Sequence, residues 1–276
     1  MDVGIEPRFR DIDGLRIRYA TSRPVGGGDQ ALLLSPWPES LYAFAPAWSR
    51  LAEDVQLVAV DLPGFGHSEG RGDLMSPSAM SGFILRIADA FDLPHPHAVG
   101  PDIATSALLF AAAAAPDRFR SLAVGNGGVA YPLQLSGRLK DFVEAPGLDA
   151  LRRITGRDLV LGVLEKMERQ GYAAPDVVRE DYLAAYDGDR FIESARYVRS
   201  FPTDLRTLAG QLPGITAPVL NVVGAHDDIL LPANGEYLTS RLSRVKSIVL
   251  DTGHFLHETA ADAYARLLAE SWTSGP

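Results

Sequence analysis

Apolar runs of strand length recur along the chain and alternate with stretches of helical periodicity. Most of these runs are continuous, which suits parallel strands that are covered on both faces. We therefore predict an α/β protein with a mostly parallel sheet and helices on both of its faces. The predicted strands are ALLLS (31–35), VQLVAV (55–60), HAVG (97–100), SLAVGN (121–126), VLNVVG (219–224) and SIVLD (247–251), and the predicted helices cover 41–52, 76–91, 103–115, 234–242 and 258–270.

Two segments depart from this alternation. Near the N-terminus, RFRDIDGLRIRYA holds two short runs joined at Asp13-Gly14, a dipeptide that suits a tight hairpin because both central residues need positive φ. Between about Tyr131 and Leu212 the chain has helical stretches, more charge and no convincing strand. The pattern predicts a core formed by residues 1–130 and 213–276, with residues 131–212 inserted as a helical cap.

The first candidate for chemistry lies where the strand HAVG runs into Pro101-Asp102-Ile103-Ala104 and then a helix. A strand, a sharp turn between small residues and a helix describe a nucleophile elbow, which lifts one side chain above the sheet edge. Here that side chain is Asp102. An alternative interpretation is that Asp102 only caps the helix, because Asp is a favoured N-cap residue.

Two later strand ends supply partners for this carboxylate. His254 follows the last predicted strand in GHFLHE, and Asp227 and Asp228 follow the preceding strand in GAHDD. Catalytic residues of open α/β sheets collect at the carboxyl ends of the strands, and nucleophile, acid and histidine occur here in the chain order of this architecture. Spacing from Gly224 favours Asp227 as the acid, whereas spacing to Pro232 favours Asp228.

The remaining histidines and the glycine-rich loop are expected to play no catalytic part. His226 and His257 are predicted to lie on the surface, and His95 and His97 have no carboxylate partner in the sequence around Pro96, so no metal site is predicted. The loop DLPGFGHSEG lacks the third glycine of a dinucleotide fingerprint. We expect it to shape one wall of the site, and we predict no cofactor.

Taken together, DLPGFGHSEG, GPDIA, GAHDD and GHFLHE resemble the α/β-hydrolase superfamily over nearly the whole chain. With Asp at the elbow, the sequence resembles the branch of epoxide hydrolases and haloalkane dehalogenases. The resemblance implies an α/β-hydrolase fold with a cap. It also implies backbone oxyanion donors at Ile103 and at Trp37, in the loop Ser35-Pro36-Trp37-Pro38-Glu39-Ser40, with a cis bond at Trp37-Pro38.

A carboxylate nucleophile predicts attack on a saturated carbon. Such attack gives an alkyl ester on Asp102, which water activated by His254 then cleaves while Asp227 orients the imidazole. The most favoured substrate is an epoxide, and the alternatives are a haloalkane or a non-hydrolytic proton transfer by Asp102 and His254.

The leaving group separates these readings. In the family that the sequence resembles, an epoxide oxygen is protonated by a pair of cap tyrosines, for which Tyr197 and Tyr131 are the candidates, with Tyr182 and Tyr186 as rivals. A halide needs N–H donors, commonly from a Trp after the nucleophile. Ile103 occupies that place here, and Trp37 supplies a single indole donor.

Composition narrows the partners without choosing the reaction. The 276 residues contain no cysteine, which excludes disulfides, thiolate metal sites and a thiol nucleophile. The net charge of −9 argues against nucleic acid, because phosphate binding needs a positive surface. No signal peptide or membrane-spanning run is expected, so we predict a cytoplasmic protein acting on a small, largely apolar molecule; the sequence carries no signal for its oligomeric state.

Overall fold

The computed structural model describes residues 3–23 and 28–274, and it confirms the predicted α/β class. Its strands are β1 (Arg8–Ile12), β2 (Leu15–Thr21), β3 (Asp29–Leu34), β4 (Val55–Val60), β5 (His97–Pro101), β6 (Ser121–Gly125), β7 (Val219–Gly224) and β8 (Val245–Leu250). Its α-helices are α1 (Ala45–Leu51), α2 (Pro77–Ala90), α3 (Ile103–Ala114), α4 (Gly137–Glu144), α5 (Gly156–Arg169), α6 (Asp176–Ala185), α7 (Arg190–Arg199), α8 (Phe201–Gln211), α9 (Ala233–Arg241), α10 (Leu256–Thr259) and α11 (Ala261–Ser274). Short 3₁₀ helices cover η1 (Leu41–Phe44), η2 (Gly72–Leu74), η3 (Leu148–Leu151) and η4 (Leu212–Gly214).

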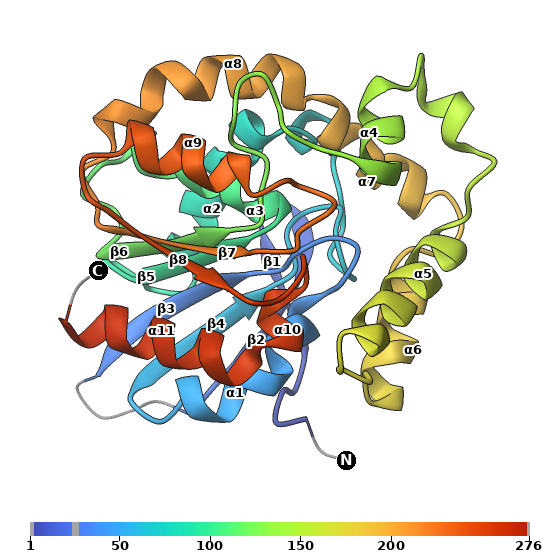
Figure 1. Ribbon diagram of the computed structural model, residues 1–276. Helices are drawn as coiled ribbons and strands as arrows, with labels where there is room; N and C mark the ends of the chain where they lie inside the picture. The colour runs from blue at the N-terminus through green and yellow to red at the C-terminus, as the bar shows by residue number, and fades with distance from the viewer. Residues whose placement is uncertain (1–2, 24–27, 275–276) are drawn as a thin grey trace.

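The strands form one twisted sheet in the order β1-β2-β4-β3-β5-β6-β7-β8. The six strands from β3 to β8 run parallel to one another, whereas β2 pairs antiparallel with both β1 and β4. Helices α1 and α11 cover one face of the sheet and α2, α3 and α9 cover the other (Figure 1). All residues of the adjacent strands β5, β6 and β7 are buried, which explains why their sequences read as continuous apolar runs.

The N-terminal hairpin forms as the sequence predicts. Asp13 and Gly14 both adopt positive φ, at 52° and 75°, and pair Ile12 with Leu15 across the turn. Beyond the hairpin, Arg18 on β2 is buried between the carboxylates of Asp61 and Asp181, at 3.3 and 2.5 Å. Asp181 lies on α6, so a buried ion pair joins the antiparallel end of the sheet to the inserted helices.

The segment predicted as a cap contains only helices among its described elements, from α4 to α8. Helices α4 to α7 stand beside the sheet, and α8 runs back over α2 and α3 (Figure 1). An isolated antiparallel bridge between Leu135 and Leu230 joins the start of this segment to the loop after β7. The helical segment is therefore attached to the core at several places.

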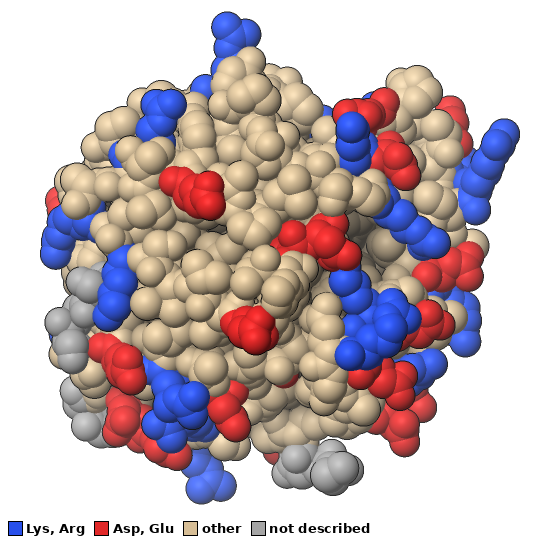
Figure 2. Space-filling view, viewed as in Figure 1, with Lys and Arg blue, Asp and Glu red and all other residues tan. Residues whose placement is uncertain are grey.

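The surface carries charges of both signs. On the face in Figure 2, lysines and arginines are mixed with acidic residues over the inserted helices, and most of the remaining surface carries few charges. This face has no extended positive patch of the kind that binds nucleic acid. None of the helices in the described ranges is long and apolar enough to span a membrane.

Candidate active site

Asp102 occupies the sharp turn between β5 and α3. Its backbone has φ 50° and ψ −122°, a region that residues with a Cβ rarely adopt, and its side chain makes no capping hydrogen bond to α3. The interpretation of Asp102 as a simple N-cap therefore lacks the contact that defines a cap. The neighbouring residue Gly127 must be small, because a Cβ there would lie 2.6 Å from the Asp102 carbonyl oxygen. The strained backbone of Asp102 is typical of functional sites, where a side chain must project from a fixed position.

His254 and Asp227 lie beside this turn, each at the end of its strand. His254 Nδ1 is 2.8 Å from Asp227 Oδ2, and His254 Nε2 is 3.5 Å from Asp102 Oδ1. The other oxygen of Asp227 accepts hydrogen bonds from the backbone N–H groups of Ile229 and Leu230, at 2.9 and 3.0 Å. The carboxylate is thus fixed by three nitrogen atoms, and it holds the imidazole with one edge toward Asp102.

The charge of this group follows from its contacts. Burial alone lowers the pKa of His254, but the carboxylates of Asp227 and Asp102 outweigh burial and raise it well above the ordinary value of 6.5. The two acids therefore favour the protonated form of His254. When one of the two negative charges is removed, the pKa of His254 must fall, which would release the imidazole to act as a base.

Asp228 points away from this group. Its carboxylate is exposed and forms an ion pair with Lys166 on α5, and its backbone carbonyl accepts a hydrogen bond from Ser136. Of the two adjacent acids in the loop after β7, the structure brings Asp227 to His254, in agreement with the spacing from Gly224.

Asn126, at the end of β6, joins three strand ends and was not singled out from the sequence. Its side-chain N–H group donates to the carbonyls of Gly253 and His254, at 3.2 and 2.6 Å, and its side-chain oxygen accepts from Gly224 N–H at 2.9 Å. The residue also has positive φ, at 44°. The sequence signal was available, because Asn is the residue other than Gly that most readily adopts this conformation.

Trp37 lies in the loop after β3 and faces Asp102. Its backbone N–H donates to Asp102 Oδ2 at 2.8 Å, and the Trp37-Pro38 bond is cis. The indole N–H donates to Ser194 Oγ on α7 at 2.9 Å, and the ring stacks on Phe191 with an interplanar angle of 3°. The indole donor considered for a halide is therefore already occupied. Ile103, the second predicted backbone donor, lies next to Asp102 in the same cavity wall.

A cavity of about 330 Å³ opens over these residues. Its core wall contains Asp102, His254, Trp37, Ile103 and Phe255, and the opposite wall comes from the helical segment. That opposite wall is apolar near α4, α7 and α8 and charged along α5. Its lining residues are Gly137, Arg138, Leu139 and Phe142 of α4, Leu159, Gly162, Val163, Glu165, Lys166 and Arg169 of α5, Val198 of α7 and Phe201 of α8.

The tyrosines predicted to face a substrate do not line this cavity in the described part of the chain. Tyr197 is buried, its hydroxyl donates to the Ile103 carbonyl at 2.9 Å, and it is absent from the cavity lining. Tyr131 is 42% exposed and borders a separate surface depression. Because a cap side chain's direction depends on how its helix packs, spacing along the sequence could not place either hydroxyl.

The rival tyrosines are also engaged elsewhere. The Tyr182 hydroxyl donates to Glu258 Oε1 at 3.0 Å, and the Tyr186 hydroxyl donates to the Glu39 carbonyl at 3.1 Å. His257, which was predicted to lie on the surface, is buried instead, because α10 turns it beneath the loop that holds Glu39. His226 is exposed as predicted and contacts Asp251.

The loop DLPGFGHSEG has a different position from the one predicted. Its residues do not belong to the described lining of the cavity at Asp102. Asp61 is buried and accepts hydrogen bonds from the backbone of Leu41 and His67, at 2.6 and 2.9 Å. The loop therefore supports η1 and the ion pair with Arg18 rather than the cavity wall.

Among known protein families, residues 32–261 match the family described as alpha/beta hydrolase fold. A curated relative, the dihydrolipoyllysine-residue acetyltransferase component of the acetoin cleaving system of Cupriavidus necator, is 31% identical over 157 residues, which are 55% of this chain and 40% of that protein. The chain spans about half the length of the curated relatives that it matches.

Two solved structures have the same fold over almost their whole length. Cfl2 from Burkholderia cenocepacia has a TM-score of 0.84 at 22% identity, covering 98% of this chain and 96% of that one. The epoxide hydrolase CorEH has a TM-score of 0.79 at 19% identity, covering 96% of this chain and 98% of that one.

Proposed function

This chain belongs to the α/β-hydrolase family, and within it we propose a hydrolase that forms an alkyl ester on Asp102 and cleaves it with water activated by His254. One observation carries the proposal. The residue at the strained elbow is a carboxylate, and it contacts both a backbone N–H donor, at Trp37, and the imidazole of the His254–Asp227 pair. A carboxylate in that position is suited to displacement at a saturated carbon.

In the first step, Asp102 Oδ1 or Oδ2 attacks the carbon, a C–O bond forms, and the bond to the leaving group breaks. The negative charge passes from Asp102 to the leaving group. The pKa of His254, which Asp102 and Asp227 together hold high, then falls because one of its two acidic neighbours has become a neutral ester.

Once its pKa has fallen, His254 gives its proton to solvent. In the second step, neutral His254 takes a proton from the attacking water, and the hydroxide adds to the ester carbonyl of Asp102. The Trp37 N–H, already hydrogen-bonded to Asp102 Oδ2, is positioned to stabilise the oxyanion that develops there. The carbonyl–alkoxy bond then breaks, the alcohol leaves with a proton, and the carboxylate is restored. Asp227 orients His254 throughout.

The substrate is proposed to be a small molecule with an apolar body. The helical segment at 131–212 acts as the cap, since side chains of α4, α5 and α7 close the cavity opposite Asp102. Back-side attack directs the leaving group toward that wall. The N–H donors of Arg138, Lys166 and Arg169 there take the place predicted for tyrosine hydroxyls. An epoxide is the first candidate, and likeness in fold to an epoxide hydrolase supports it.

A halide is the second candidate, and the cavity lining favours it in one respect. A halide leaves without needing a proton, so a lining of cationic N–H donors without tyrosine, in the described residues, suffices for it. An epoxide oxygen requires that one of those donors give up a proton, and Lys166 is the lining residue able to do so.

The test is intact-protein mass spectrometry of His254→Gln incubated with panels of epoxides and haloalkanes. Without the base, the ester should accumulate as a covalent adduct whose mass equals that of the whole epoxide, or of the haloalkane minus the hydrogen halide. Peptide mapping should place it on Asp102. If neither panel gives an adduct, the alkyl-ester mechanism is wrong.

Two controls sharpen this test. Asp102→Asn in the His254→Gln background should form no adduct, since the nucleophile is absent. His226→Gln should leave wild-type turnover nearly unchanged, since His226 is exposed, contacts Asp251 and does not line the cavity. Once a substrate is found, Lys166→Met separates the candidates: it should suppress ring opening of epoxides far more than displacement of halides.

A further inference from the structure

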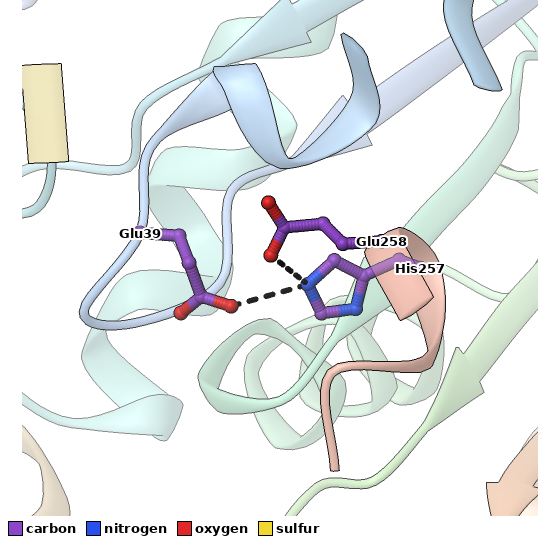
Figure 3. A group of neighbouring side chains, drawn as sticks. All are labelled: Glu39, His257 and Glu258. Atoms are coloured by element: carbon purple, nitrogen blue, oxygen red, sulfur yellow. Dashed lines mark hydrogen bonds and ion pairs between the residues drawn. The ribbon is translucent and has the colours of Figure 1, made fainter. Parts of the chain in front are cut away.

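A second cluster of titratable side chains lies outside the cavity. Glu39, from the loop after β3, and His257 and Glu258, both from α10, converge on one point (Figure 3). His257 Nε2 is 3.2 Å from Glu39 Oε1 and 3.9 Å from Glu258 Oε2. All three side chains are at least 97% buried, and none of them belongs to the described lining of the cavity at Asp102.

The hydrogen bonds of this cluster are incomplete. Glu258 Oε1 accepts from the Tyr182 hydroxyl at 3.0 Å, but Glu258 Oε2, Glu39 Oε2 and His257 Nδ1 are buried without a hydrogen-bond partner. Buried polar atoms are almost always paired, and an unpaired carboxylate in the interior is especially costly. The unpaired oxygens of two different acids in one cluster therefore indicate that something binds between them.

The charge of the cluster indicates which kind of ligand binds between the two acids. The two carboxylates are buried together, and within the described residues their ion pairs are with His257 and not with an arginine or lysine. A proton on Glu258 neutralises one of the two charges, whereas a divalent cation neutralises both.

We propose that Glu39, His257 and Glu258 form a buried binding site for a divalent transition-metal ion. Their ligand atoms lie within 4.8 Å of one another, and metal–ligand bonds of about 2.0–2.2 Å require separations of no more than about 4.4 Å. A shift of a few tenths of an ångström in each side chain is enough. One imidazole and two carboxylates suit Zn²⁺ or Mn²⁺, and the Tyr182 hydroxyl orients the Glu258 ligand from outside the metal.

The position of the site gives it a structural role. Glu39 is two residues from Trp37, and α10 begins two residues after His254. An ion shared by Glu39 and α10 would clamp together the two loops that hold the backbone donor and the base. It would also draw in α6, which carries Tyr182. The ion is expected to raise thermal stability and leave the chemistry to the cavity.

The experiment loads the full-length chain, stripped with a chelator, with Zn²⁺, Mn²⁺ or Co²⁺ and removes free metal by gel filtration. We expect about one ion per chain by elemental mass spectrometry and a higher Tm than that of the stripped protein. With Co²⁺, ligand-field absorption bands of an N/O site should appear. His257→Gln and Glu258→Gln should lose both the bound ion and these bands.

Three further variants keep the result interpretable. His226→Gln removes the exposed histidine that pairs with Asp251, and Asp102→Asn removes the acid of the cavity, so both should retain the ion. Tyr182→Phe keeps every ligand and should weaken binding about 10- to 100-fold, a readout that does not require the ligand variants to fold. If the wild-type chain binds no ion, or if His257→Gln still binds it, the proposal is wrong. The buried carboxylates would then be neutralised by protons instead.

Discussion

Two histidines three residues apart, His254 and His257, each contact a pair of carboxylates, yet the two clusters are built oppositely. Around His254, Asp227 accepts two backbone hydrogen bonds and Asp102 accepts one from Trp37. Around His257, two acids keep unpaired oxygens in the interior. The first cluster opens to a cavity and the second does not. Residue type alone therefore does not identify a catalytic group; access to substrate and the state of the hydrogen bonds distinguish the two.

The largest expected effect is on the cavity cluster. Asp102→Asn should reduce turnover of a substrate by about 10⁶-fold, the cost of removing a covalent nucleophile. His257→Gln should change turnover by less than about tenfold, because His257 touches no cavity residue that reacts. Steady-state kinetics on both variants checks this. An active Asp102→Asn enzyme, or a His257→Gln enzyme as inactive as it, would remove the distinction between the clusters.

A smaller loss is expected within the first cluster. Asp227→Asn should lower turnover by about 10⁴-fold, since the amide no longer fixes the tautomer of His254 or stabilises its charged form. His226→Gln is the control one residue away, and it should stay near wild type because His226 is exposed and contacts Asp251. Equal losses in kcat for the two variants would mean that the loop after β7 rearranges when substrate binds.

The second cluster should contribute to the pH dependence of stability in the metal-free protein. The pKa of Glu258 is raised in the folded state, so its contribution is fully present below about 4.5 and is lost as pH rises toward the folded pKa. Glu258→Gln removes this loss. Its Tm relative to wild type should therefore increase from pH 4.5 upward, by calorimetry with a chelator present. A constant difference in Tm across pH would contradict the unpaired carboxylate.

The titration of His254 provides a corresponding test of the first cluster. Its pKa is raised above 6.5, so its contribution to stability is present below pH 6.5 and is lost as pH rises through the folded pKa. Asp102→Asn removes one of the two acids responsible and should lower this pKa. NMR titration of the imidazole in both proteins measures the change, and an unchanged pKa would show that Asp227 alone controls the proton.

The smallest effects are expected from two buried phenols, one near each cluster. Tyr197→Phe and Tyr182→Phe each remove a hydrogen bond, to the Ile103 carbonyl and to Glu258 respectively. Each should cost about 1 kcal/mol of unfolding free energy, with turnover within about tenfold of wild type. Urea denaturation and kinetics test both. A loss of several orders of magnitude in Tyr197→Phe would restore that hydroxyl as a proton donor to the leaving group.

Most of the fold was predictable because its signals are local. Continuous apolar runs marked the buried strands, for example 55–60, and Asp13-Gly14 marked the hairpin. The predicted helix 258–270 is interrupted, since α10 ends at Thr259 and α11 begins at Ala261. Asp102, Asp227 and His254 could be brought together from sequence because each follows a strand, and strand ends meet at one edge of a parallel sheet.

The rest depended on packing that sequence periodicity does not encode. Tyr131 lies at the start of the helical segment and Tyr197 lies late in it. The directions of their hydroxyls, however, follow from how that segment packs against the core. Glu39 and His257 are 218 positions apart, and no local pattern announces that they meet. Long-range contacts between polar residues of different loops are where reasoning from a single sequence fails.

The buried Arg18 has a consequence for synthesis of the chain. Its first acid, Asp61, emerges 43 residues later, but its second, Asp181, lies 163 residues later. In a nascent chain that has completed the hairpin, β4 and Asp61, the Arg18 guanidinium can therefore pair with only one of its two carboxylates. Until α6 has been translated and has docked, the N-terminal part of the sheet keeps an open polar seam, where a chaperone or a misplaced acidic side chain can compete for Arg18.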